Sequence, residues 1–236
     1  MSDWQAEVQL EPFGDGIYTL EGDRLRMLGI PFETRMTVVR LSDGTLWLHS
    51  PVAPSEARFE AVASLGAVAH IVAPNKFHHL FLAPWAERFP GATTWADAAL
   101  QARRRDFAFG ALLAPGVATP WGDAIDHVFF AGSRFLNEYT FFHRGSRTLI
   151  VTDLVQNHEP EADGLFWRTI KRGIGVLGPN GGSPLDWRLT VTDRAAARAS
   201  REAILCFDFE RMIITHGRCW KSGARSAFED AFRWLG

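Results

Sequence analysis

Cysteine is scarce in this sequence of 236 residues, and its scarcity excludes a class of protein. Cys206 and Cys219 are the only two cysteines, which is too few for a disulfide framework, and they do not form a close pair with metal-ligand spacing. We expect both thiols to be reduced, with Cys206 in the core, because free cysteine is among the most buried residue types.

Long apolar runs are absent as well. No run approaches the ~20 apolar residues that cross a bilayer, so the sequence predicts no membrane-spanning segment and no membrane partner. The N-terminal stretch MSDWQAEVQLEPFGDG carries acidic residues early and lacks the basic start and apolar core of a signal peptide. We therefore expect a cytoplasmic location.

An excess of positive charge is also lacking. The formal net charge is −2, and the one basic run, at residues 103–105, is short. Such a chain offers no basic field to the phosphate groups of DNA or RNA. These properties exclude nucleic acid as an expected partner and leave a small-molecule substrate or ligand.

The sequence does contain the pattern of a layered α/β protein. Residues 35–50 alternate apolar and polar on both sides of Asp43-Gly44, a dipeptide typical of tight β-hairpin turns. Strand and helix patterns then follow each other without a linker, which predicts a single domain over residues 1–236. Strands are expected at 69–73, 92–95, 126–131, 138–143, 147–152 and 211–215, and helices at 55–65, 80–88, 96–105, 166–174, 194–205 and 222–235.

Potential metal ligands follow three of the predicted strands. His78 and His79 come after strand 69–73, while Asp153 and His216 each end a later strand. Layered α/β folds usually place their ligands at the carboxyl ends of strands. Imidazole and carboxylate groups suit zinc, iron or manganese, and a catalytic ion needs about three protein ligands plus an open water position. The pattern predicts one divalent metal ion bound by residues of this set.

The order of elements resembles the metallo-β-lactamase fold superfamily, and within it an uncharacterised branch known as a domain of unknown function. Residues 72–79, VAPNKFHH, resemble the strand and turn that carry the superfamily's histidine-rich motif. Residues 147–154 resemble the strand that delivers its bridging aspartate, and RMIITHG is similar to the strand that delivers its last histidine. The resemblance implies a four-layer αββα sandwich with the site along one edge.

The chain departs from the superfamily motif His-any-His-any-Asp-His. Aligned on the last histidine of the motif, this sequence has Pro74 and Lys76 at the first two histidines and His78 at the aspartate, so that only His79 is kept. The middle histidine, expected just after a glycine, falls near Ser133. The resemblance therefore implies a degenerate site rather than a dinuclear one.

The first functional hypothesis is a mononuclear metal-dependent hydrolase. His78, His79, Asp153 and His216 are its expected metal ligands, and Asp153 and His78 its expected catalytic residues. For the five other histidines a structural role in strands or exposed loops is preferred: His49, His70, His127, His143 and His158.

Two alternatives belong to other classes. One is a metal-free binding module for a small molecule, in which adjacent histidines and carboxylates still perform acid–base chemistry. Its expected lining is Lys76, His78, His79, Asn137, Glu138 and Asp153. The other is structural: Trp85, Trp121 and Trp220 face an edge and form a homo-oligomer interface, while the histidines only cap loops.

Overall fold

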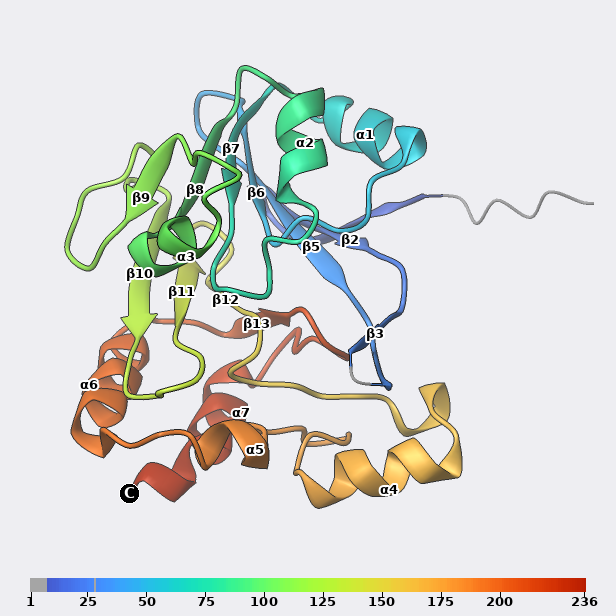
Figure 1. The fold of residues 1–236 in the computed structure, drawn as a ribbon, viewed down its shortest axis with the longest axis vertical. Helices are drawn as coiled ribbons and strands as arrows, with labels where there is room; N and C mark the ends of the chain where they lie inside the picture. The colour runs from blue at the N-terminus through green and yellow to red at the C-terminus, as the bar shows by residue number, and fades with distance from the viewer. Residues whose placement is uncertain (1–7, 28) are drawn as a thin grey trace, which may run out of the picture.

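The computed structural model describes residues 8–27 and 29–236, whose strands form two main sheets and a small separate hairpin (Figure 1). The larger sheet has the order β1-β2-β5-β6-β7-β8-β9, the smaller one β10-β11-β12-β13, and β3 pairs with β4 alone. The strands are β1 Leu10–Gly14, β2 Ile17–Glu21, β3 Leu25–Met27, β4 Ile30–Phe32, β5 Arg35–Arg40, β6 Leu46–His49, β7 Val68–Val72, β8 Thr93–Asp97, β9 Ala111–Leu113, β10 Ile125–Phe130, β11 Glu138–His143, β12 Thr148–Val151 and β13 Arg211–Ile214.

Helices lie outside both sheets. They are α1 Glu56–Ala63, α2 Leu82–Arg88, α3 Ala98–Arg103, α4 Leu165–Gly173, α5 Leu185–Arg188, α6 Arg194–Leu205 and α7 Ala224–Ala231, with the short 3-10 helices η1 Pro160–Ala162 and η2 Arg233–Leu235. Figure 1 shows α1, α2 and α3 beside the larger sheet, and α5, α6 and α7 in the half that holds β13. Within the described residues, none of these helices combines the length and apolar character needed to span a bilayer.

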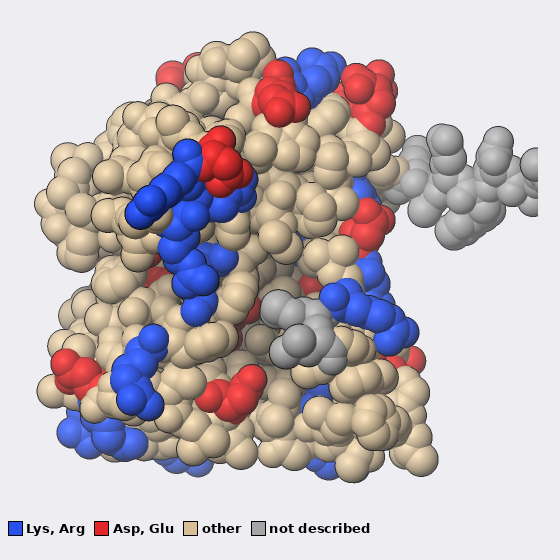
Figure 2. Space-filling view, in the orientation of Figure 1, with Lys and Arg blue, Asp and Glu red and all other residues tan. Residues whose placement is uncertain are grey.

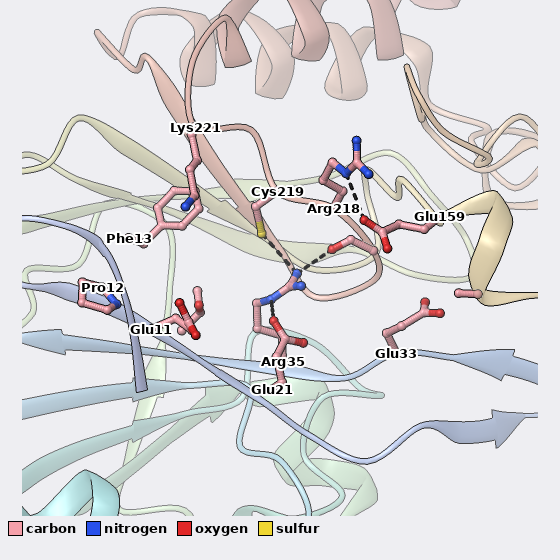
Figure 3. A pocket seen from close by; sticks show the side chains of 13 residues that line it. Glu11, Pro12, Phe13, Glu21, Glu33, Arg35, Glu159, Arg218, Cys219 and Lys221 are labelled. Atoms are coloured by element: carbon pink, nitrogen blue, oxygen red, sulfur yellow. Dashed lines mark hydrogen bonds and ion pairs between the residues drawn. The ribbon is translucent and has the colours of Figure 1, made fainter. Parts of the chain in front are cut away.

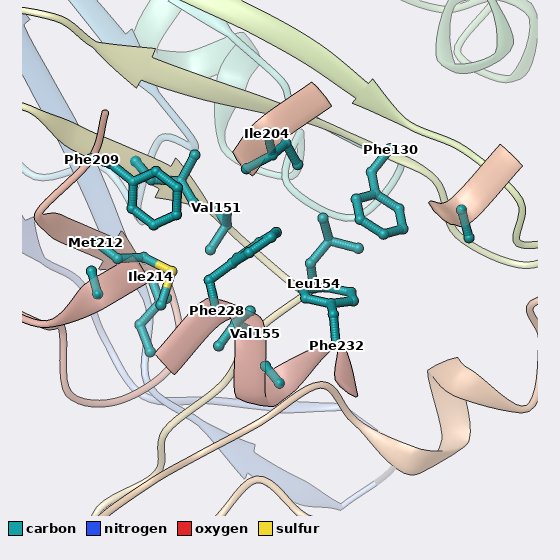
Figure 4. Packing of buried hydrophobic residues seen from close by; sticks show 14 of the residues in the cluster. Phe130, Val151, Leu154, Val155, Ile204, Phe209, Met212, Ile214, Phe228 and Phe232 are labelled. Atoms are coloured by element: carbon teal, nitrogen blue, oxygen red, sulfur yellow. The ribbon is translucent and has the colours of Figure 1, made fainter. Parts of the chain in front are cut away.

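Three apolar clusters separate four layers. One cluster packs α1, α2 and α3 against the larger sheet, through Val62, Trp85 and Leu100 among others. A second lies between the two sheets. The third packs α5, α6 and α7 against the smaller sheet, and includes Phe228 and Phe232 (Figure 4). This is the αββα sandwich that the resemblance implied.

Alternation along the strands produces these layers. In β12, Leu149 and Val151 face the helices, whereas Ile150 faces the other sheet. In β5, Val38 belongs to the helix-side cluster and Val39 to the cluster between the sheets. Because successive side chains of a strand point to opposite faces, a continuous apolar run fits a strand that is buried on both faces.

The predicted hairpin at residues 35–50 is confirmed. β5 and β6 pair antiparallel, with Arg40 opposite Leu46. Gly44 has a φ of +83°, a conformation that glycine adopts readily, and the Asp43 carboxylate accepts a hydrogen bond from the Thr45 amide. The other predicted elements are also present, although α3 begins later than expected, because Asp97 ends β8 and caps the helix.

Several expectations about burial are wrong. Cys206 is exposed rather than in the core, because it is the C-cap of α6. Trp85 and Trp121 are fully buried in separate clusters and cannot form an exposed interface, which removes two of the three tryptophans from the oligomer hypothesis. His158 is fully buried, not part of an exposed loop.

Candidate metal centre

The carboxyl ends of two strand pairs meet at one edge of the sandwich. β6 runs parallel to β7 in the larger sheet, and β12 runs parallel to β13 in the smaller one. The residues just beyond these ends include Ser50, His78, Asp153 and His216. A backbone hydrogen bond of 2.9 Å from the Tyr139 amide to the Pro74 carbonyl ties the two sheets together here.

Three of the four predicted ligands form one group. The nearest nitrogen or oxygen atoms of His78, Asp153 and His216 all lie within 4.8 Å of one another. Asp153 stands between the imidazoles: its Oδ2 is 3.3 Å from His78 Nε2, and its Oδ1 is 3.3 Å from His216 Nε2. The three side chains are 10%, 14% and 8% exposed in that order, so the group is recessed but accessible to water.

A second set of hydrogen bonds fixes the orientation of each member. Ser50 Oγ lies 2.6 Å from His78 Nδ1, and the Glu33 carbonyl lies 2.7 Å from His216 Nδ1. Asn75 Nδ2 donates to Asp153 Oδ2 at 2.8 Å. Partners of this kind orient metal ligands and set the tautomer of the histidines.

The Glu33 carbonyl determines which nitrogen of His216 carries a proton. A carbonyl oxygen can only accept, so His216 Nδ1 must donate to it. In a neutral imidazole, Nε2 then presents a lone pair to Asp153 Oδ1, which also carries lone pairs. Two lone pairs that face each other repel. The contact between Nε2 and Oδ1 is favourable when a cation lies between the two atoms, or when Nε2 carries a proton.

Asp153 is the anionic centre of the group. Burial opposes its ionisation, but His78 and His216 outweigh burial and hold the pKa of its carboxyl well below the ordinary value. The carboxylate is therefore charged at neutral pH. An ionised carboxylate flanked by two imidazole nitrogens is a donor set that suits zinc, iron or manganese.

The spacing of the donors also fits a metal ion. Four tetrahedral ligands with bonds of about 2.0–2.2 Å lie about 3.4 Å from one another. Each imidazole Nε2 lies 3.3 Å from an oxygen of Asp153, His78 from Oδ2 and His216 from Oδ1, and all three donors lie within 4.8 Å of one another. The residues present therefore fit one divalent ion.

The Glu138 carboxylate binds the backbone of the loop that carries Asp153. It is fully buried at the start of β11 and accepts hydrogen bonds from the backbone amides of Thr152 and Asp153, at 2.9 Å and 2.8 Å. Burial and the charge of Asp153 raise the pKa of Glu138 to about 7. Glu138 is therefore a buried support of the loop, rather than part of the polar pocket lining expected from the sequence.

His79 is not part of the group, contrary to the ligand set expected from the sequence. The Asn75 side chain accepts hydrogen bonds from the amides of Phe77 and His78, and of the two adjacent histidines only His78 lies in the group with Asp153 and His216. Burial and the charge of Arg104, the residue that ends α3, lower the pKa of His79. Its Nδ1 is buried and has no hydrogen-bond partner among the described residues.

Lys76, which occupies the position of a motif histidine, contacts two aromatic rings. Its Nζ lies 3.8 Å from the ring centroid of Phe135 and 5.0 Å from that of Phe77. Both distances are within the range of cation–π contacts. The ammonium group is thus placed over aromatic rings.

A buried ionic cluster lies beside His216, and no sequence pattern predicted it. His158 stacks on His216 with ring centroids 6.4 Å apart, and its Nδ1 is 2.7 Å from Glu33 Oε2. Lys171 Nζ pairs with Asp163 at 2.7 Å and lies 3.1 Å from His158 Nδ1. The partners come from segments far apart in the sequence, so no local pattern predicts them.

The chain has the metallo-β-lactamase fold. The chain belongs to the family described as Domain of unknown function (DUF4336), whose sequence profile matches residues 14–166. No curated protein matches the chain.

Solved structures show the same fold at low sequence identity. The DIM-1 metallo-β-lactamase is 12% identical, with a TM-score of 0.67 and coverage of 98% of each chain. A metallo-β-lactamase from Hirschia baltica is 12% identical over 97% of each chain, with a TM-score of 0.65. A flavodiiron protein from Giardia intestinalis is 12% identical, with a TM-score of 0.69, over 97% of this chain and 59% of that one.

Proposed function

We propose that this protein is a mononuclear metal-dependent hydrolase in which His78, Asp153 and His216 bind one divalent ion. The proposal rests on the close approach of these three donors. Each of them also forms a hydrogen bond that orients it, with Ser50, Asn75 and the Glu33 carbonyl as the partners. Zinc, iron or manganese in this position would supply a Lewis acid that lowers the pKa of a water molecule.

The protein's own groups would orient that water and a small-molecule substrate. Asp153 is charged, hydrogen-bonded to Asn75 and partly exposed, so it would accept a hydrogen bond from that water and orient it. His78 lies beside it, with its Nδ1 bound to Ser50. Asp153 and His78 are therefore the proposed catalytic residues.

A second candidate is the metal-free binding module. It is supported by the direct contacts of 3.3 Å between Asp153 and both imidazoles, which also suit hydrogen bonds from protonated histidines. In this case the same group would bind a polar ligand and transfer protons without a metal.

Two adjacent histidines provide a matched test of the first candidate. Metal content would be measured for the full chain purified without chelator, and thermal unfolding with and without zinc, manganese or ferrous iron. Wild type and His79→Ala should each contain one ion per chain and gain stability from the metal. His78→Ala should lose both properties, because removing a ligand removes most of the affinity.

The opposite results would favour the second candidate. Wild-type protein without stoichiometric metal, and without a metal-dependent rise in unfolding temperature, would contradict the hydrolase proposal. Loss of metal in His79→Ala together with retention in His78→Ala would show that the ligand set is wrong.

A further inference from the structure

A cavity of about 400 Å³ lies outside the metal centre, between the larger sheet and the loop that follows β13 (Figure 3). We propose that it binds a small zwitterionic ligand, whose anionic group contacts Arg35 and Lys221 and whose cationic group faces Glu11. The charged residues of its lining are Glu11, Glu21, Glu33, Arg35, Glu159, Arg218 and Lys221.

Arg35 is a rigid anchor for an anion. Its side chain is 11% exposed, its Nε donates to Glu21 at 2.5 Å, and its Nη1 donates to the Gly217 carbonyl at 2.8 Å and to Cys219 Sγ at 3.1 Å. Its Nη2 donates no hydrogen bond to the residues that the structure describes. A guanidinium held by several bonds loses little freedom when its remaining Nη2 group donates to a carboxylate.

Lys221 adds a second positive group to the same cavity. Its side chain lines the cavity, and in Figure 3 it lies on the opposite side of Arg35 from Glu33. Within residues 8–27 and 29–236, no carboxylate lies within the ion-pair distance of 4.0 Å from Lys221. The third cation, Arg218, is already paired with Glu159 at 3.0 Å.

One carboxylate of the cavity favours a positive group on the ligand. Glu21 and Glu159 are neutralised by Arg35 and Arg218, and Glu33 is paired with His158 at 2.7 Å and with Arg24 at 3.5 Å. Glu11 has no ion pair in the described part of the chain. A ligand with only a negative charge would leave Glu11 unpaired and would be repelled by it.

The cavity is separate from the metal centre although the two are neighbours. Gly217 and the Glu33 carbonyl lie next to His216, but the His216 Nε2 that faces Asp153 is the nitrogen on the other side of the ring. The volume is within the range of about 300–1,000 Å³ of small-ligand pockets and suits an amino acid or a short peptide. Binding here therefore needs no metal, and this proposal stands apart from the proposed hydrolase function.

Three compounds of one chain length separate the charges: 6-aminohexanoate, hexanoate and hexylamine. Calorimetric titration of the full chain in EDTA should show that 6-aminohexanoate binds at least about tenfold more tightly than either singly charged analogue. No binding of any of the three would overturn the proposal. Equal binding of hexanoate and 6-aminohexanoate would overturn the zwitterionic assignment.

Variants locate the binding. Lys221→Ala and Glu11→Gln should each weaken 6-aminohexanoate at least about fivefold, since each removes one charge that a ligand group would contact. Arg233→Ala, an exposed site with a side chain 80% accessible, should bind like wild type. Arg35→Lys should abolish binding. If that variant does not fold, the affinities of Lys221→Ala and Glu11→Gln test the location of the ligand. Unchanged affinity in both Lys221→Ala and Glu11→Gln would show that the ligand binds elsewhere.

Discussion

Among single residues, Ser50 combines an unusual backbone conformation with a hydrogen bond to a proposed metal ligand. It is buried just beyond β6, has a φ of +57°, and its Oγ lies 2.6 Å from His78 Nδ1. Residues other than glycine seldom adopt a positive φ, and such conformations concentrate at functional sites. The backbone at Ser50 is held in this conformation while its hydroxyl orients His78.

Two substitutions of Ser50 separate these roles. Ser50→Ala and Ser50→Gly should each weaken metal binding by about 10–100-fold, because both remove the hydroxyl that orients a ligand. Ser50→Gly should nevertheless be more stable than Ser50→Ala by about 1 kcal/mol, since glycine tolerates the positive φ. Competition with a coloured zinc chelator and urea unfolding would measure the two effects. Undiminished affinity in both variants would contradict the orienting role.

The sequence predicted some residues of the site and not others. His78, Asp153 and His216 were predictable because each follows a recognisable strand. Ser50 and Asn75 were not, since single polar residues in loops have no period and act through bonds to distant segments. His79 has the same sequence signal as His78, and the sequence has no pattern that tells which of the two lies beside Asp153.

At the scale of elements, Asn75 joins the loop after β7 to the end of β12. Its Oδ1 accepts from the Phe77 and His78 amides, while its Nδ2 donates to Thr152 Oγ1 at 2.9 Å and to Asp153 Oδ2 at 2.8 Å. One side chain therefore shapes the turn that carries a ligand and connects it with the other sheet.

Replacing Asn75 by alanine should affect stability and metal binding together. We expect a loss of about 2–4 kcal/mol, because several buried partners lose their hydrogen bonds, and a weaker metal affinity. Urea unfolding and metal titration would measure both, with the exposed Asn180→Ala as the control. A change below about 0.5 kcal/mol, typical of a surface site, would show that the two sheets are held without this residue.

Strong local patterns also explain which elements were predictable. The β5–β6 hairpin has alternating residues around Asp43-Gly44, and α6 begins at the capping residue Asp193, so both were recognisable. β3 and β4 have only three residues each, and α5 has only four. None of these three elements is long enough to show a periodic pattern of apolar residues. These short elements depend on contacts with the rest of the molecule.

For the whole molecule, the buried His49 predicts sensitivity to acid. Burial and the neighbouring His78 lower the pKa of His49 from 6.5 to about 3. The folded protein keeps this imidazole neutral, whereas the unfolded chain takes up a proton below about pH 6.5. Its contribution to stability is therefore complete above that pH and is lost as the pH falls towards 3.

The expected loss is about 1.4 kcal/mol for each pH unit between about 6 and about 3. Burial alone would raise the pKa of Glu33, but the hydrogen bond and charge of His158 lower it to about 2. Glu33 should therefore add to the loss of stability below about pH 4.5. Urea unfolding at successive pH values would measure the slope. His49→Phe should reduce it, since His49 already packs against Trp47 and Phe141 and its Nε2 has no described partner. An equal slope in that variant would assign the acid sensitivity to other groups.

A crystal grown with zinc and measured across the zinc absorption edge would show whether His78, Asp153 and His216 bind one divalent ion. We expect one anomalous peak per chain at this site, with His78 Nε2, His216 Nε2 and an Asp153 oxygen about 2.0–2.2 Å away. A peak elsewhere, or an ordered site in which Asp153 still contacts both imidazoles and no peak is present, would contradict this prediction.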